Sequence, residues 1–319
     1  MEIEIELSDL LVKNFSKYAN HIVYERAIPL LNDGLKPVQR RVLLSMNNLG
    51  LNNNKPFKKA AKVIGDTVGQ YHPHSLDGPY GALVNMTATF SARYPLGEGN
   101  GNYGSIEGDS CAAMRYVESK LSKTGDLLLG DTNEATVPWM PTYDNEGLEP
   151  KYLGGFFPNI LCNYTNGIAA GVSSMIPSHN ATEVITALIK TIDQVNKGKD
   201  INTKFLMKYI KGPDFPTEGI IMNPEDIESV YDNGKGKFII RGQYTIKNKK
   251  ELVFTTIPYT TNVGVIMTGL KKLKEAKLCG EFKNYSAKGT LNISIKPARG
   301  QSVDDLIKQV FKKTKLEDN

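Results

Sequence analysis

Apolar and polar residues follow two different periods along this chain of 319 residues, and these periods predict both helices and strands. Apolar residues spaced three and four apart, as on one face of a helix, mark most of the predicted elements. This spacing predicts helices at residues 8–25, 37–46, 58–69, 80–89, 180–192, 263–276 and 303–313. Alternation at every second residue predicts strands at 238–240, 251–254 and 290–295. No internal repeat or low-complexity tract interrupts this pattern.

Residue types at the ends of these segments support the predicted helices. Ser8 is a suitable N-cap for the first helix, and Pro37 suits the first turn of the second. Asn180 opens a further helix, with Glu183 at the capping-box position. The helices at 37–46 and 58–69 flank a polar turn and so resemble a helix-turn-helix. Five glycines between residues 94 and 108 predict a hairpin or wing in place of a helix.

Composition excludes several classes of protein. Hydrophobic residues make up 40% of the chain and charged residues 23%, which is an ordinary globular balance. No run of 18 apolar residues occurs, and the nearest candidate, 156–176, is broken by Pro158 and several polar residues, so we expect no membrane span. The first residues do not resemble a secretory signal. Three scattered cysteines offer neither a disulfide framework nor a zinc ribbon, and they favour a reducing, cytoplasmic location.

Positive charge is concentrated near the start of the chain. The formal net charge is only +5, which by itself is a weak indication of an anionic partner. Between residues 34 and 65, however, there is no Asp or Glu and there are seven basic residues: Lys36, Arg40, Arg41, Lys55, Lys58, Lys59 and Lys62. This stretch predicts a phosphate-binding surface. The alternative is that these side chains form two solvated helix faces.

Several motifs in one order resemble a known family. Residues 33–41 read DGLKPVQRR, 71–74 read YHPH, and 99–105 read GNGNYGS. They are followed by AMRY at 113–116, IAAG at 168–171, IPSHN at 176–180 and GPDFPT at 212–217. The series resembles the A subunits of bacterial type IIA DNA topoisomerases, meaning DNA gyrase, topoisomerase IV or a phage homologue. The resemblance covers nearly the whole chain.

The resemblance implies an α+β fold with three parts. Residues 1–28 would form an N-terminal arm helix, and residues 29–136 a winged-helix, CAP-like DNA-gate domain that carries the nucleophilic tyrosine. Residues 137–319 would form an incomplete α/β tower domain, truncated before the coiled coil and the exit gate of the family. The wrapping domain that separates supercoiling from relaxation would also be absent, so neither activity is assigned.

The family motif assigns a catalytic constellation to this sequence. Tyr116 would attack a backbone phosphate and form a phosphotyrosine ester that stores the energy of the broken bond. Because free tyrosine has a pKa near 10, attack at neutral pH needs help, and Arg115 would stabilise the phosphate. Arg26 would come from the other protomer. His72 and His74 would lie near the same phosphate, with His74 favoured for proton handling.

The same resemblance implies contacts with DNA. Ile168 would wedge between base pairs and bend the duplex, although a buried strand or turn position is an alternative for this residue. Phosphate contacts are assigned to the basic residues near the start of the chain: Lys36, Arg40, Arg41, Lys58, Lys59 and Lys62.

Cofactors and partners follow from the resemblance too. Residues 107–110 read EGDS, like the start of a magnesium-binding Toprim motif, but no Asp-x-Asp follows, so we interpret them as wing structure without a metal. No phosphate-binding loop of the Gly-x-x-x-x-Gly-Lys type is present. Magnesium and ATP are expected on a separate subunit that carries the Toprim and ATPase domains. The expected assembly is a homodimer across the DNA gate, or an A2B2 heterotetramer, on double-stranded DNA in a bacterial cytoplasm or a phage-infected cell.

One departure from the family concerns fluoroquinolone drugs. Bacterial relatives usually place a serine, and an acid four residues later, in the helix after His-Pro-His, where both hold a water–magnesium bridge to the drug. Here Asp77 and Gly81 occupy these positions. With Gly78 and Pro79 following, Asp77 is predicted to be the N-cap of that helix. Resistance to these drugs is the resulting prediction.

The sequence leaves one alternative function open and excludes another. A non-catalytic winged-helix DNA-binding fragment, or a split-gene product, would keep the cationic surface but would not cleave. A tyrosine recombinase requires a His-x-x-Arg element, and none of the four histidines has an arginine three residues later, which excludes this class.

Overall fold

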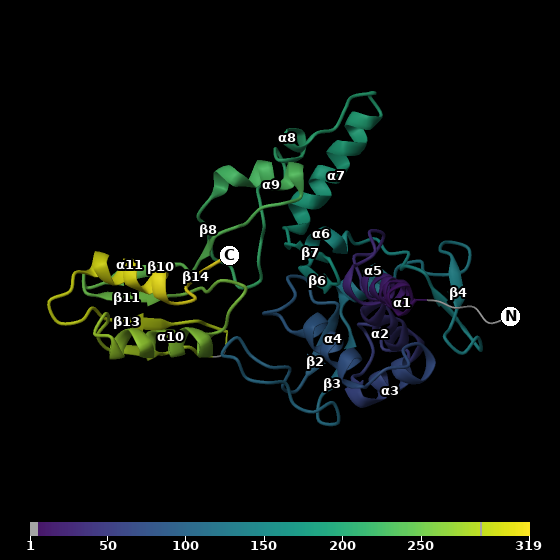
Figure 1. Ribbon diagram of the computed structural model, residues 1–319, viewed down its shortest axis with the longest axis horizontal. Helices are drawn as coiled ribbons and strands as arrows, with labels where there is room; N and C mark the ends of the chain where they lie inside the picture. Colours follow the sequence, from purple (N-terminus) through teal and green to yellow (C-terminus); the bar gives the residue numbers. More distant parts are fainter. Residues whose placement is uncertain (1–5, 288) are drawn as a thin grey trace. The chain divides into compact units, whose positions relative to one another are not determined.

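The structure is a computed structural model that describes residues 6–287 and 289–319 (Figure 1). Its contacts divide the chain into two compact units. Unit 1 holds the residues up to Tyr103 and Cys111–Val184, and unit 2 holds Gly104–Ser110 and Ile185–Asn319. The units divide near residue 184 and not at the boundary near residue 137 that the change of composition suggested. The segment from 137 to 184 packs with the preceding helices.

Unit 1 is built from helices and three small sheets. Its helices are α1 (Leu7–Ile22), a π-helical turn η1 (Val23–Ala27), α2 (Pro37–Asn48), α3 (Ala60–Gln70), α4 (Asp77–Thr87), α5 (Lys123–Leu129) and α6 (Asn159–Cys162). Its strands are β1 (Lys58–Lys59), β2 (Gly97–Asn100), β3 (Glu118–Leu121), β4 (Trp139–Pro141), β5 (Leu148–Pro150), β6 (Thr165–Ala169) and β7 (Val172–Ile176).

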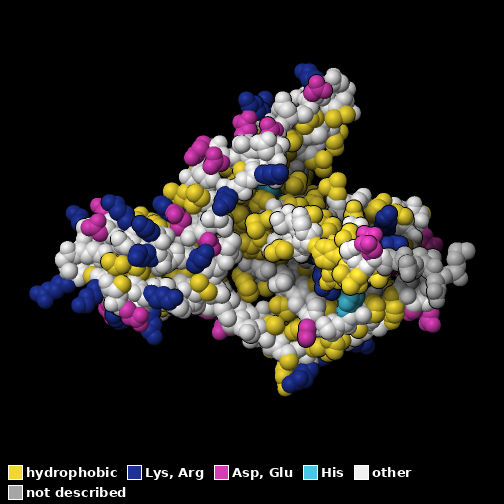
Figure 2. Space-filling view, viewed as in Figure 1, with side chains coloured by type: hydrophobic (Ala, Val, Ile, Leu, Met, Phe, Trp, Pro, Cys, Tyr) yellow, Lys and Arg dark blue, Asp and Glu magenta, His cyan; other side chains and the backbone are white. Residues whose placement is uncertain are grey.

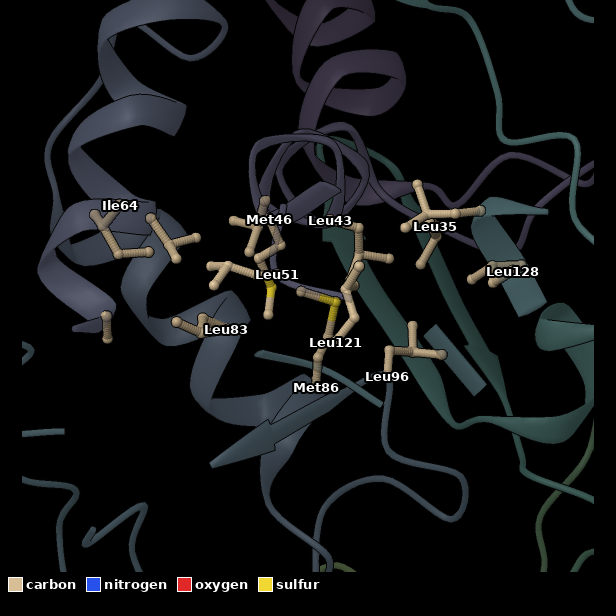
Figure 3. Close-up of a cluster of buried hydrophobic side chains, with 14 of the residues drawn as sticks. Leu35, Leu43, Met46, Leu51, Ile64, Leu83, Met86, Leu96, Leu121 and Leu128 are labelled. Carbon is tan, nitrogen blue, oxygen red and sulfur yellow. The ribbon is translucent and has the colours of Figure 1, made fainter. Parts of the chain in front are cut away.

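The core of unit 1 lies where α2, α3 and α4 meet the sheet of β1, β3 and β2. Figure 3 shows its apolar side chains converging from these elements, among them Leu43, Met46, Leu83 and Leu121, each fully buried. The sheet is antiparallel with the order β1-β3-β2, so the third strand in sequence lies in the middle. The order along the chain is therefore helix, strand, two helices, and then two paired strands.

Unit 2 contains a four-stranded antiparallel sheet and a smaller three-stranded one. The helix α7 (Ala181–Val195) leads into it. Its other helices are α8 (Thr203–Leu206), the 3-10 turn η2 (Pro224–Asp226), α9 (Ile227–Asn233), α10 (Val263–Glu275) and α11 (Val303–Lys313). Its strands are β8 (Ile220–Ile221), β9 (Ile240–Arg241), β10 (Tyr244–Lys247), β11 (Glu251–Phe254), β12 (Phe282–Asn284), β13 (Ile293–Ile295) and β14 (Glu317–Asp318).

A second core fills unit 2 between its larger sheet and two helices. The sheet has the order β10-β11-β13-β12, and buried residues of β11 and β13 pack against α10 and α11. Phe254 and Phe311 meet edge to face in this core, with ring centroids 5.8 Å apart. The smaller sheet has the order β14-β9-β8 and joins the last residues of the chain to β9.

The predicted elements are largely confirmed, with local corrections. The helix 303–313 has the predicted bounds, and Pro37 is the first residue of α2. Ser8 is not an N-cap, because α1 begins at Leu7 and Glu6 takes the cap position. Lys58 and Lys59 form a strand and not the start of a helix, because their backbone pairs with β3. No helix among the described residues is long and apolar enough to cross a membrane.

The glycine-rich segment from 94 to 108, predicted as a hairpin or wing, does not form a hairpin of its own. Only 97–100 form a strand, and their partner is β3, which lies beyond the run. Residues 104–110 belong to unit 2, where the carbonyls of Ile106 and Glu107 accept the N–H groups of Val263 and Gly264 at the start of α10, both at 3.0 Å. Glu107 is therefore bound to the start of α10, and the interpretation of residues 107–110 as wing structure stays a prediction.

Candidate functional site

Tyr116 stands exposed in a turn that leads into β3. Its side chain is 63% exposed, and the guanidinium carbon of Arg115 lies 4.7 Å from the centre of its ring. The backbone N–H of Tyr116 donates to the carbonyl of Ala113 at 2.9 Å, which closes the turn. A cation held over an aromatic face is stabilised by the negative charge of the ring face. The phenol is thus open to a large substrate and has a positive charge beside it.

His72 and His74 lie in the loop between α3 and α4. Their rings stack with centroids 4.4 Å apart. The first ring is partly buried, and its Nδ1 lies 3.0 Å from Nη1 of Arg41. Burial, followed by the positive charges of Arg41, His74 and Arg26, lowers the pKa of His72 to about 4. This ring is consequently neutral at pH 7.

Arg26 lies in the π-helical turn η1 and is exposed. Because its charge acts on His72, Arg26 and the two histidines form one cluster. Among the described residues, no hydrogen bond, ring contact or charge interaction links this cluster to Arg115 and Tyr116. One chain therefore does not bring all five predicted catalytic residues together.

Two of the predicted phosphate contacts are occupied inside unit 1. Arg40 is 5% exposed, and its Nε and Nη2 donate to the Asp33 carboxylate at 2.7 and 3.0 Å. Arg41 makes a two-pronged bond to Glu149, at 2.7 and 2.6 Å. A guanidinium with this geometry is held in place by its carboxylate. Arg40 and Arg41 thus each have an internal ion pair, and their assignment to phosphates stays a prediction.

The four lysines of the predicted set differ in exposure. Lys36 donates through Nζ to the carbonyl of Asn166, and burial lowers its pKa. Lys58 donates to the carbonyl of Leu49 at 2.8 Å. Lys59 is exposed and pairs with Glu118 at 3.2 Å, while Lys62 is exposed and has no ion pair among the described residues. Lys59 and Lys62 thus remain the most accessible members of the set.

Ile168 is 83% exposed on β6, in the hairpin formed by β6 and β7. The alternative of a buried position for this residue is therefore wrong. The hairpin approaches the backbone of η1 closely, because a Cβ at Gly167 would lie 1.9 Å from the carbonyl oxygen of Ala27. Only glycine permits this approach. Lys36 also donates to the carbonyl of Asn166, so the hairpin backbone that carries Ile168 is held at two neighbouring residues.

The predicted drug-pocket positions lie at the start of α4. Asp77 is its first residue, with Leu76 at the cap position and no side-chain capping bond. The prediction that Asp77 is the N-cap is therefore wrong, and its exposed carboxylate is not engaged as a cap. Gly81 lies one turn later, and a Cβ added there would have no atom within 4 Å.

The carboxylates of residues 107–110 have local partners in unit 2. Asn284 donates to Glu107 at 2.7 Å, and the hydroxyl of Ser105 donates to Asp109 at 2.6 Å. No group of three or more histidine, cysteine or acidic residues that could hold a metal occurs among the described residues.

Sequence reasoning missed Asp33 and Glu149 as site residues. Asp33 opens the DGLKPVQRR motif, and its partner Arg40 lies seven residues later, so the motif contained a signal. Glu149 lies 108 residues from Arg41 and is one of several acids between residues 131 and 149. Nothing in the sequence marks it.

Comparison with known proteins identifies the class. The model of the family that comprises the A subunits of DNA gyrase and topoisomerase IV matches residues 26–319. The chain belongs to this family, which confirms the resemblance found in the motifs.

Individual proteins that are similar to this chain belong to the same family. The A subunit of DNA topoisomerase 4 from Staphylococcus epidermidis is 40% identical over 321 residues, which cover 98% of this chain and 40% of that protein. The A subunit of DNA gyrase from Clostridium acetobutylicum is 37% identical, with 99% of this chain and 38% of that protein covered. Its counterpart from Pseudomonas aeruginosa is also 37% identical, with 99% and 35% covered. The chain thus spans about two fifths of the length of these relatives.

Proposed function

We propose that this chain is the DNA-gate part of a type IIA topoisomerase and that it cleaves and reseals double-stranded DNA through Tyr116. The observation that carries the proposal is an exposed phenol with the Arg115 guanidinium over its ring, in the AMRY motif that resembles the family's Arg-Tyr pair. The order of elements around α2, α3, α4, β2 and β3 supports a winged-helix gate, with the β2–β3 pair as the wing.

The chemistry is a reversible transfer of a phosphoryl group. The phenolic oxygen of Tyr116 loses its proton and bonds to the phosphorus, and the bond from phosphorus to the 3′ oxygen breaks. The 3′ oxygen takes up one proton and leaves as a hydroxyl, so the step consumes no net proton. The tyrosine then holds the 5′ end of the strand. Attack by the 3′ hydroxyl reverses both changes. Arg115 stabilises the negative charge that gathers on the phosphate oxygens.

Two copies of the chain are proposed to complete each site. Within one chain, Arg26 and the two histidines are not in contact with Tyr116. A second protomer can supply this cluster across a DNA gate. The exposed Ile168, on a hairpin held at Asn166 and Gly167, is proposed to enter the base stack, because an apolar wedge lowers the cost of bending DNA.

Magnesium and ATP are proposed to bind a partner subunit of the Toprim/ATPase kind. The carboxylates of Glu107 and Asp109 are already bonded to Asn284 and Ser105, which supports placing the metal elsewhere. The purified chain should therefore bind DNA and leave it intact at every magnesium concentration. Magnesium-dependent cleavage by the chain alone would overturn this assignment.

The decisive experiment measures the covalent adduct between protein and DNA in the presence of magnesium and the partner subunit. Tyr116→Phe removes one oxygen and no charge, so the adduct should fall by at least about a thousandfold while DNA affinity changes less than about twofold. Tyr285→Phe, at a tyrosine that is 57% exposed, is the matched control and should cleave like the wild type. An adduct that survives Tyr116→Phe would identify another nucleophile. A wild type that binds DNA and forms no adduct would support a non-catalytic DNA-binding fragment.

A further inference from the structure

Arg41 connects a buried carboxylate to the ring of His72. Its Nε and Nη2 donate to the two oxygens of Glu149, and its Nη1 lies 3.0 Å from Nδ1 of His72. The side chains of Arg41 and Glu149 are 13% and 4% exposed. Because both charges are shielded from water and joined by two bonds, Glu149 fixes the orientation of the guanidinium.

This contact determines which ring nitrogen carries the proton. A guanidinium has only donors, so Nδ1 of His72 accepts from Arg41. The proton of the neutral ring is then on Nε2. Protonation of the ring would place an N–H group at Nδ1 against the donor of Arg41 and would bring two positive charges together.

The positively charged and titratable groups whose charge lowers the pKa of His72 oppose its protonation: Arg41, Arg26 and His74. Arg41 approaches from α2, Arg26 from η1, and His74 from the same loop, and each disfavours a positive ring. The carboxylate of Glu149 approaches from β5 but is neutralised by Arg41, which lies between it and the ring. A ring in these surroundings can donate through Nε2 but cannot accept a proton at neutral pH.

We propose that Glu149 and Arg41 form a clamp that fixes His72 as a neutral hydrogen-bond donor through Nε2, with Glu149 as a positioning residue. This inference rests on the proposed function, in which the Nε2–H group donates to an oxygen of the scissile phosphate. His72 then stabilises charge and does not take the proton of the tyrosine. The exposed ring of His74, stacked on it, remains available for proton transfer.

The tautomer can be measured with the chain alone, free of DNA and of any partner. Nitrogen NMR of the chain labelled in its four histidines distinguishes the two ring nitrogens of each. For His72 we expect the proton on Nε2 and no titration between pH 8 and about pH 5. A proton on Nδ1, or a titration midpoint near 6.5, would overturn the proposal.

A double substitution tests whether the clamp is the cause. Arg41→Met together with Glu149→Met replaces a buried ion pair by apolar side chains, which proteins often tolerate. The midpoint of His72 should rise by at least about one pH unit, because the cation at Nδ1 is gone. The ring of His179, whose Nδ1 lies 2.9 Å from the carbonyl oxygen of Leu161, reports whether unit 1 is still folded.

The matched control replaces another ion pair in the same way. Arg241 and Glu317 pair within unit 2, so Arg241→Met with Glu317→Met should leave the titration of His72 unchanged. If the double variant at Arg41 and Glu149 is folded and His72 keeps its wild-type midpoint, the clamp does not set its protonation. If the double variant does not fold, the single variant Arg41→Gln, which removes the cation and leaves an amide that can donate to Glu149, should raise the midpoint in the same direction.

Cleavage by the assembled enzyme then tests the donor role. A glutamine can place an N–H group near the position of Nε2 and cannot titrate, whereas leucine offers no donor. His72→Gln should therefore form at least about ten times more adduct than His72→Leu, since loss of one donor to a developing charge typically costs 10²–10³ in rate. Equal losses would contradict the donor role. If the wild type and Tyr116→Phe form equally little adduct, the proposed function fails, and the NMR result still decides the clamp.

Discussion

Unit 1 and unit 2 differ in how they use charged side chains. By sequence, unit 1 has 15 Lys and Arg against 17 Asp and Glu, a net charge of −2, although it contains every predicted catalytic residue. Unit 2 has 24 Lys and Arg against 17 Asp and Glu, a net charge of +7. Figure 2 shows many Lys and Arg side chains over the part of unit 2 that holds α10 and α11.

The two units also differ in whether their basic side chains have acidic partners. In unit 1, Arg40 and Arg41 are each bonded to one buried carboxylate. In unit 2, the exposed lysines Lys272, Lys312 and Lys313 line a cavity of about 910 Å³ and form no ion pair among the described residues. The net charge of a unit thus indicates how strongly it attracts an anion from a distance. Catalysis depends instead on the positions of individual side chains.

The largest effect is expected from Arg40→Ala. The substitution leaves the carboxylate of Asp33 buried without its cation, which should lower the free energy of unfolding of unit 1 by about 3–5 kcal/mol. Urea unfolding followed by the fluorescence of Trp139 measures it. Lys59→Ala, which breaks the exposed pair with Glu118, is the control and should have a much smaller effect. Equal effects would mean that burial of the pair does not matter.

Acid should destabilise unit 1 through His72. The folded pKa of about 4 lies below the ordinary value of 6.5, so the unfolded chain binds the proton first. Stability from this group is complete above pH 6.5 and is lost as the pH falls towards 4. Urea unfolding at pH 7.5 and 4.5 should show this loss in the wild type and a smaller one in His72→Gln, which cannot titrate. The same pH dependence in both proteins would exclude His72 as the source.

The free lysines of unit 2 should dominate the salt dependence of DNA binding. Replacing Lys272, Lys312 and Lys313 by Gln should reduce the slope of log affinity against log salt by about 2.7. Between 50 and 200 mM salt, the wild type should then lose roughly 40-fold more affinity than the variant. The matched control replaces Lys190, Lys204 and Lys283, each paired with an acid. If both variants change the slope equally, the net charge of unit 2 matters and not the three free lysines.

The smallest effect concerns drugs and the start of α4. Because Asp77 lacks a hydroxyl and Gly81 lacks a side chain, the assembled enzyme should respond weakly to fluoroquinolones. Asp77→Ser with Gly81→Asp should increase drug-stimulated cleavage about tenfold, as expected for one restored bonded bridge. The open space around Gly81 admits the new side chain. Strong stimulation of the wild type would show that the exposed Asp77 carboxylate holds the bridge without a serine.

Local signals in the sequence predicted several element bounds, and its motifs predicted the class of protein. Periodicity predicted α11 with its observed bounds, and Pro37 marked the first residue of α2, because both signals act within one turn of helix. The ordered motifs placed the chain in its family. The winged-helix gate, the tower and the roles of Tyr116 and its neighbours stay predictions until they are measured.

The use of the charged residues depends on contacts between distant segments, which the sequence does not show. The run of basic residues from 34 to 65 predicted a phosphate surface, yet Arg41 is bound by Glu149, which lies 108 residues away. The position of the hairpin that carries Ile168 also depends on a distant segment, because Gly167 lies against the backbone of Ala27. A sequence states which charges and shapes exist. The packing of distant segments decides which charged groups come into contact. It therefore decides whether a cation is free to bind DNA or holds a histidine in place.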